Sequence, residues 1–251
     1  MGDRPDQPNA DRTVFGPPAG WWRHWPATLV LAGYLVLLAW LTLAAAGPGT
    51  VWWDPPVQRD LRRLDGTEWD AVATFGNWLG TTPVGLVILA IVAAPLLVWR
   101  HVREAALLGG VALIRSVNWL VKWVVDSPRP GTTARGTNDV ASGLGYPSGH
   151  AMGTMLIGGA LVFVVFRLSR SARARAIAVL LATAALLATG FGRIVTRAHW
   201  PSDVAGGWLW GAGLLGLVVL LVGFADRRWR AGHRWPTRHR LGGPGQSAEP
   251  N

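Results

Sequence analysis

The sequence contains no cysteine, a single lysine and few charged residues of any kind. Without cysteine the chain can form neither disulfide bonds nor thiolate metal sites. Charged residues make up 15% of the chain and hydrophobic residues 50%. An ordinary soluble domain carries about 25% charged residues. The composition therefore argues against a soluble protein.

The apolar residues are gathered into long blocks. An uncharged run of about 20 residues is enough to cross a bilayer as a helix, and a helix satisfies its own backbone hydrogen bonds there. We predict an all-α, polytopic membrane protein with a bundle of six transmembrane helices. The expected spans are 26–47, 80–99, 104–125, 149–166, 176–192 and 204–224. The third differs from the others because it contains Arg115 and Lys122.

The two ends of the chain differ from this apolar middle. Residues 1–22 are polar and rich in Pro and Gly, which predicts a disordered tail. They do not have the pattern of a signal peptide. Residues 226–251 are rich in Arg, Gly and Pro and are expected to form a basic, disordered tail. The predicted six-span domain covers residues 23–225.

The net charge of +10 would suit nucleic acid, but its distribution favours a membrane protein. Of the 24 Lys and Arg residues, 15 lie in the two tails and the connections after spans two and four, and 8 lie on the other side. The positive-inside rule then places both termini in the cytoplasm. We expect a multi-pass protein of a bacterial plasma membrane, with the connections after spans three and five facing outward.

One outward segment has a pattern of its own. Residues 55–70 place Val57, Leu61 and Leu64 at helical spacing, with charged residues between them. This pattern predicts a short helix lying on the outer membrane surface. A plain solvated loop is the alternative.

Polar residues of a chemically unusual kind gather in three outward stretches. The first, "KWVVDSPRP", holds Lys122 and Arg129, and its prolines end the third span. The second, "PSGH", places Ser148 as the N-cap of the fourth span. The free N–H groups and the dipole of a helix N-terminus bind anions. The third, "GRIVTRAHWPSD", contains Arg193. Together these stretches predict a site for phosphate, because Lys and Arg supply charge and bidentate contacts to it.

Two histidines give this site a chemical role. Asp203 lies four residues after His199, so its carboxylate can orient that imidazole as a base or nucleophile. His150 has no such partner and suits the donation of a proton to a leaving group. The combination indicates phosphoryl transfer through a phosphohistidine. A zinc or iron site formed by His150, His199 and Asp203 is the alternative, but the nearby cations would repel a divalent ion.

Lys122 and Arg115, the two cations within the third span, allow two further predictions. Lys122 is the only lysine beside 23 arginines, so its retention points to a specific role rather than to snorkelling at a span end. Arg115 lies two helical turns before Lys122 and is expected to share its helix face. An intramembrane charge almost always faces the bundle interior. We therefore predict that Arg115 points inward, toward a polar or anionic partner.

The three stretches resemble the signature motifs of the type 2 phosphatidic acid phosphatase superfamily, Lys-x6-Arg-Pro, Pro-Ser-Gly-His and Ser-Arg-x5-His-x3-Asp. The six-span layout is similar to the membrane branch of that family. The resemblance implies a metal-independent enzyme without a cofactor, in which His199 is the nucleophile, Asp203 orients it and His150 is the general acid. It implies phosphate binding by Lys122, Arg129, Ser148, Gly149 and Arg193. The sequence departs from the third motif at Gly192, where the family has serine, and this puts one phosphate contact in doubt.

A membrane lipid phosphatase is the leading functional hypothesis. Its substrate would be a lipid phosphate such as undecaprenyl diphosphate, phosphatidic acid or phosphatidylglycerol phosphate, and nucleic acid is not expected as a partner. A transferase that passes the phosphoryl group or phospho-headgroup to an alcohol could use the same site. A lipid transporter or scaffold that keeps the fold is a non-enzymatic alternative, although both His199 and Asp203 are present. The sequence carries no signal for the oligomeric state.

Overall fold

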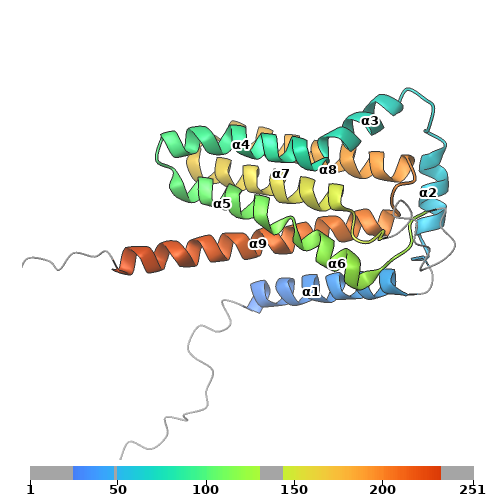
Figure 1. Cartoon of the computed structure of the whole chain (residues 1–251), viewed down its shortest axis with the longest axis horizontal. Helices are drawn as coiled ribbons and strands as arrows, with labels where there is room; N and C mark the ends of the chain where they lie inside the picture. The colour runs from blue at the N-terminus through green and yellow to red at the C-terminus, as the bar shows by residue number, and fades with distance from the viewer. Residues whose placement is uncertain (1–24, 48–49, 131–143, 233–251) are drawn as a thin grey trace, which may run out of the picture.

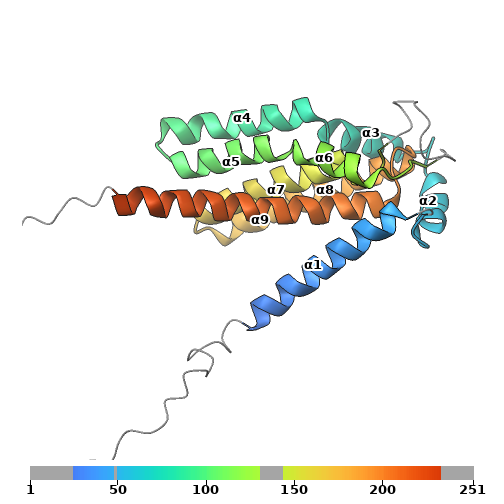
Figure 2. The ribbon, with the colours of Figure 1, turned by 60° about the horizontal axis from the view of Figure 1, so that its bottom comes forward.

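The computed structural model describes residues 25–47, 50–130 and 144–232. Within these ranges the chain is helical and contains no strand. Its helices are α1 (Trp25–Ala46), α2 (Asp54–Arg62), α3 (Asp70–Leu79), α4 (Thr82–Val98), α5 (Val102–Ile114), α6 (Val117–Val125), α7 (Gly149–Leu168), α8 (Ala172–Val195) and α9 (Pro201–Gly232). Helices α4, α5, α7, α8 and α9 run side by side in one bundle (Figures 1 and 2).

The predicted all-α membrane fold is confirmed. Five segments are long and apolar enough to cross a membrane, namely α1, α5 with α6, α7, α8 and α9. A sixth candidate is the pair α3 and α4, which bends by 64° at its break. Two boundaries differ from the prediction. The third span is broken into α5 and α6 at Arg115 and Ser116, and α9 continues to Gly232, beyond the expected domain end at 225.

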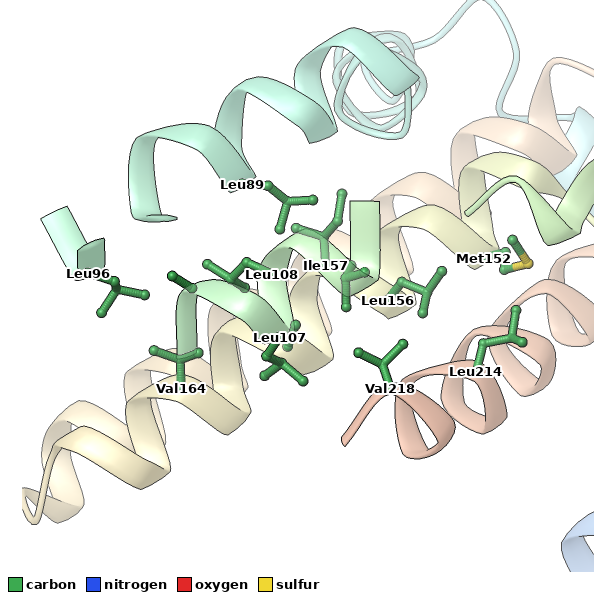
Figure 3. Packing of buried hydrophobic residues seen from close by; sticks show 13 residues of the cluster. Leu89, Leu96, Leu107, Leu108, Met152, Leu156, Ile157, Val164, Leu214 and Val218 are labelled. Carbon is green, nitrogen blue, oxygen red and sulfur yellow. The ribbon is translucent and has the colours of Figure 1, made fainter. Parts of the chain in front are cut away.

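The core of the bundle surrounds α7. Met152 and Leu156 of α7 are almost completely buried there, and residues of α4, α5 and α9 complete their cluster (Figure 3). In contrast, most side chains of α1 are exposed, and α1 slants away from the bundle (Figure 2). Exposed leucines and valines along α1 suit a helix whose neighbours include lipid.

Helix α1 joins the bundle near its C-terminal end. The Tyr146 side chain is fully buried, and its hydroxyl lies 2.9 Å from the Thr42 hydroxyl of α1. Trp210 of α9 donates a 3.3 Å hydrogen bond to the same Thr42 oxygen. Gly206 makes room for the tyrosine, because a Cβ there would lie 2.1 Å from the ring. The loop that leads into α7 is therefore fixed between α1 and α9.

Helix α2 crosses the end of the bundle, roughly perpendicular to the long helices (Figure 1), and packs on α8 and α9. The predicted helix over 55–70 is confirmed as far as Arg62. Its continuation is wrong, because residues 63–69 form turns before α3 begins at Asp70. Asp54 and Gln58 bury their side chains against the bundle, so the packing of polar groups, as well as apolar spacing, holds α2 in place.

The end of the bundle covered by α2 also collects the C-termini of α6 and α8 and the N-termini of α7 and α9 (Figures 1 and 2). The beginning of α1 and the end of α9 point toward the opposite end. All three polar stretches thus lie at the opposite end of the bundle from the start of α1 and the end of α9. The predicted tail 1–22, and the part of the predicted tail 226–251 that follows Gly232, lie outside the described residues.

Candidate active site

The N-terminus of α7 forms one wall of the site. Ser148 caps the helix, since its hydroxyl accepts a 3.4 Å hydrogen bond from the Ala151 N–H. The Ser148 N–H donates 2.9 Å to the backbone oxygen of Asp203, which ties this wall to the start of α9. The predicted N-cap is therefore confirmed. The first turn of α7 presents free N–H groups at the end of the bundle where an anion can reach them.

The predicted pairing of His199 and Asp203 is confirmed. The His199 Nδ1 lies 3.2 Å from the Asp203 Oδ2, and both side chains are almost completely buried. The Trp200 N–H donates 3.0 Å to the same carboxylate oxygen. The spacing of four residues works because Asp203 lies in the first turn of α9, and its carboxylate reaches back to Trp200 and His199 just before that helix. A carboxylate in this position holds Nδ1 as the N–H donor and leaves the Nε2 lone pair for chemistry.

The environment keeps His199 neutral. Burial holds the pKa of the His199 imidazole well below its usual value, and the positive charges of Lys122, Arg193 and Arg129 lower it further. A neutral imidazole is the form that can act as a nucleophile or base. All three predicted cations are thus close enough to His199 to act on its charge.

Two of the cations, Lys122 and Arg193, come from different helices. Lys122 of α6 donates hydrogen bonds to the carbonyls of Leu144 and Gly145, at 2.6 and 2.9 Å. An ammonium has three N–H groups, so a third remains for a ligand. Arg193 of α8 has a buried Nε without a hydrogen-bond partner among the described residues. A buried donor left in this way is costly unless a ligand satisfies it, and a phosphate oxygen would do so.

His150 faces the same region from the first turn of α7. It interacts electrostatically with Arg193, His199, Arg115 and Lys122. Gly80, between α3 and α4, lies directly against its ring, because a Cβ there would lie 2.8 Å from the His150 Cδ2. The fold therefore brings together all eight residues that the sequence singled out, although they come from α6, α7, α8, α9 and the connections between them.

Sequence reasoning missed Asn77, which lies on α3. Its amide oxygen accepts a 3.2 Å hydrogen bond from Arg193 Nη1. Nearby, Gly192 allows α3 and α8 to pack closely, since a Cβ at Gly192 would lie 2.4 Å from the Ala73 carbonyl oxygen. The departure from the family motif thus has a steric reason. A side chain at position 192 would collide with α3, and Asn77 supplies a polar contact to the neighbouring arginine.

Asp54 was missed as well. It is almost completely buried and accepts hydrogen bonds from the Ser202 N–H at 2.8 Å and the Ser202 hydroxyl at 2.6 Å. Burial raises the pKa of the Asp54 carboxyl, and the charge of Asp203 raises it further, whereas the hydrogen bonds from Ser202 oppose the shift. Asp54 therefore fixes the first turn of α9, immediately beside Asp203. The isolated "WWDPP" of the sequence gave no signal for this contact.

Arg115 points inward, as predicted, and its polar partner is the Thr82 hydroxyl at 3.2 Å. Its reason for doing so differs from the prediction. Arg115 is the C-cap of α5, whereas Lys122 lies on α6, so the two do not share the face of one continuous helix.

The alternative metal site is not assembled. Among the described residues, no three His, Asp or Glu side chains gather closely enough to hold a metal ion. His199 and Asp203 meet each other, while His150 faces a surrounding of positive charge.

Comparison with known proteins places this arrangement in a family. The model of the PAP2 superfamily matches residues 103–227, which include all three polar stretches. The chain belongs to the PAP2 superfamily. The resemblance drawn from the motifs is thereby confirmed, and with it a phosphatase of the membrane as the class of protein.

Two solved structures are similar to this PAP2 protein. One is described as the first transmembrane PAP2 type phosphatidylglycerolphosphate phosphatase from Bacillus subtilis; the match has 20% identity and a TM-score of 0.60, and covers 83% of this chain and 98% of that one. The other is LpxE of Aquifex aeolicus, with 20% identity, a TM-score of 0.51, and coverage of 67% and 96% respectively. These likenesses concern the fold. No curated protein matches the sequence.

Proposed function

We propose that this PAP2 protein is a lipid phosphate phosphatase that works through a phosphohistidine on His199. The observation that carries the proposal is the buried His199–Asp203 pair, with Nδ1 and Oδ2 3.2 Å apart, inside a cluster of cations. A neutral imidazole held by a carboxylate is an activated nucleophile. The cations around it would neutralise the charge on a phosphoryl group as it is transferred.

The reaction has two steps. First, Nε2 of His199 forms a bond to phosphorus while the bond from phosphorus to the leaving oxygen breaks, and His150 gives that oxygen a proton. The lipid leaves as its alcohol or as a shorter phosphate. Next, a water molecule loses a proton to His150 and attacks phosphorus. The N–P bond breaks, and inorganic phosphate leaves.

The phosphate oxygens have separate partners in this scheme. Lys122, Arg129 and Arg193 would hold the non-bridging oxygens together with the Ser148 hydroxyl and the Gly149 amide. The depth of the site, where α7 enters the bundle, suits a lipid whose apolar tail stays in the bilayer. Metal independence is part of the proposal, because the cations occupy the role that a metal would otherwise fill.

Phosphate release from a panel of lipid phosphates by the purified protein tests the activity. His199→Ala should abolish turnover, and wild-type protein quenched during turnover should carry an acid-labile phosphate that His199→Ala lacks. Activity in excess EDTA should equal activity without it. Normal turnover by His199→Ala would overturn the mechanism, and restoration by a divalent ion after EDTA treatment would overturn metal independence.

We also propose that the site faces the outside of a bacterial plasma membrane. The support is the larger number of Lys and Arg residues in the two sequence tails and in the connections after spans two and four, 15 against 8. Since the chain has no native cysteine, single exposed cysteines can report the orientation. Glu68→Cys, between α2 and α3, should react with an impermeant reagent on intact cells, and Ala172→Cys, at the start of α8, should react only after permeabilisation. The reverse pattern would contradict the orientation.

A further inference from the structure

A cleft leads away from His150 between α4, α5, α6 and α7. It has a volume of about 390 Å³, within the usual range for small-ligand sites. Its polar lining consists of Thr82, Arg115, Ser116, Asn118 and His150. We call it the Arg115 cleft. Its apolar lining includes Leu86 and Trp119, both of which are largely exposed on the outer face of the bundle. The cleft thus connects a catalytic histidine with the side of the protein that lipid would cover.

The Arg115 guanidinium fits into the cleft because the neighbouring positions on α4 and α7 are glycines. A Cβ at Gly85 of α4 would lie 2.6 Å from Arg115 Nη1, and a Cβ at Gly153 of α7 would lie 2.7 Å from its Cζ. Gly153 follows His150 by three residues, which corresponds to about 4.5 Å along α7. The break between α5 and α6 at Arg115 directs the side chain toward these two glycines. The guanidinium therefore lies about one helical turn deeper than the histidine.

No carboxylate of the described residues pairs with the charge of Arg115. Ion pairs formed by the described residues link Arg63 with Asp60, Arg103 with Asp226, Arg167 with Glu104 and His199 with Asp203, and none involves Arg115. Its guanidinium donates a hydrogen bond to the neutral Thr82 hydroxyl. An arginine within a membrane span is costly and usually marks a functional site. An anionic ligand would provide the missing countercharge.

The position of the cleft indicates which part of the substrate enters it. In the proposed function His150 protonates the leaving oxygen, so the group attached to that oxygen lies on the His150 side of the phosphate. The cleft begins at His150, and Arg115 is the cation among its lining residues. An uncharged leaving group would give the Arg115 guanidinium no anionic partner.

We infer that Arg115 binds a second phosphate on the leaving side of the substrate, so that the enzyme prefers lipids with two phosphorus groups. The second group would be the inner phosphate of a lipid diphosphate or the phosphodiester of a phosphorylated phospholipid. Both present the same chemistry to a guanidinium, which binds phosphate oxygens in a bidentate manner. This inference rests on the proposed function, and it assigns Arg115 to specificity rather than to the transfer step.

Matched substrate pairs test the inference. The first pair is a prenyl diphosphate and the monophosphate of the same prenyl chain. The second is phosphatidylglycerol phosphate and phosphatidic acid with the same acyl chains. Arg115→Gln should lower kcat/KM about 10- to 100-fold for the two-phosphorus member of at least one pair and less than about threefold for the monophosphates. The pair that shows the selective loss identifies the kind of second phosphate.

Two further variants separate binding from folding. Arg115→Lys keeps the charge but loses the bidentate geometry, so it should recover part of the selectivity. Gly153→Ala keeps the arginine and displaces its guanidinium, so it should lower the two-phosphorus activity selectively. Gly109→Ala on α5 is its control, because a Cβ there meets nothing within 4 Å. Melting temperatures in detergent show whether each variant folds.

The outcomes are distinguishable. An equal loss on both members of each pair, or no loss on any of them, would overturn the inference and leave the proposed function standing. Failure of the wild-type protein to hydrolyse any of the four lipids would instead overturn the proposed function itself.

Discussion

Restoring the serine of the family motif at position 192 should harm this protein. In the structure, a Cβ at Gly192 would lie 2.4 Å from the Ala73 carbonyl oxygen and 3.2 Å from the Asn77 backbone nitrogen. Contacts below 3.0 Å are essentially never seen for a real Cβ atom, so α3 would have to retreat by at least about 0.6 Å. Overpacking of this kind destabilises a protein by about 1–3 kcal/mol.

The same displacement should disturb the site. Asn77 lies on α3 and accepts the 3.2 Å hydrogen bond from Arg193 Nη1, so a retreat of α3 lengthens that bond. A hydrogen bond to a charged group contributes about 1.5–3 kcal/mol. If the phosphate contact of Arg193 depends on it, Gly192→Ser should lower kcat/KM by about 10- to 100-fold. The destabilisation should lower Tm by about 2–12 °C for a chain of this size.

The assay combines thermal unfolding in detergent with phosphate release from a lipid phosphate. Gly109→Ser is the matched control, because its Cβ meets nothing within 4 Å, and it should keep wild-type Tm and activity. Asn77→Ala leaves α3 in place and removes the hydrogen bond, so it should lower kcat/KM with a smaller change in Tm. A Gly192→Ser protein with wild-type Tm and equal or higher kcat/KM would refute the steric reasoning.

Three further predictions concern other parts of the site. Lys122→Ala should lower kcat/KM about 10- to 100-fold through the loss of a charged hydrogen bond, and Lys122→Arg should recover only part of it; full efficiency in Lys122→Ala would mean that the lysine merely snorkels. Asp54→Ala leaves the buried Ser202 donors unpaired, so it should lower the free energy of unfolding by about 1–3 kcal/mol. Both Tm and kcat should fall. An unchanged Tm would show that Asp54 does not stabilise the start of α9. Because the pKa of His199 is held well below its ordinary value of about 6.5, the folded protein opposes protonation of this ring. Its stability relative to His199→Gln should therefore fall as pH drops below about 6.5, by about 1.4 kcal/mol per unit until the folded pKa is reached, and a pH-independent difference would contradict the shift.

The sequence by itself predicted most of the spans and singled out the residues that are proposed to be catalytic. Run length decides whether a helix can cross a bilayer, so five of the six apolar blocks appear as helical spans, and the block 80–99 appears as α4 of the bent pair. The His199–Asp203 contact could also be predicted, because a carboxylate in the first turn of a helix can reach a residue just before that helix. The three motifs required no packing information either, since each is a local pattern.

Tertiary structure decided which residues support that set. The Arg193–Asn77 bond joins residues 116 positions apart, and the Ser202–Asp54 bonds join residues 148 positions apart. No local pattern marks Asn77 or Asp54, because their roles exist only when α3 and α2 pack against α8 and α9. Likewise, Arg115 could be expected to point inward, but its cleft depends on the break after α5 and on two glycines from other helices. Periodicity and spacing describe one helix at a time, whereas a binding site at the end of a bundle is made by the packing between helices.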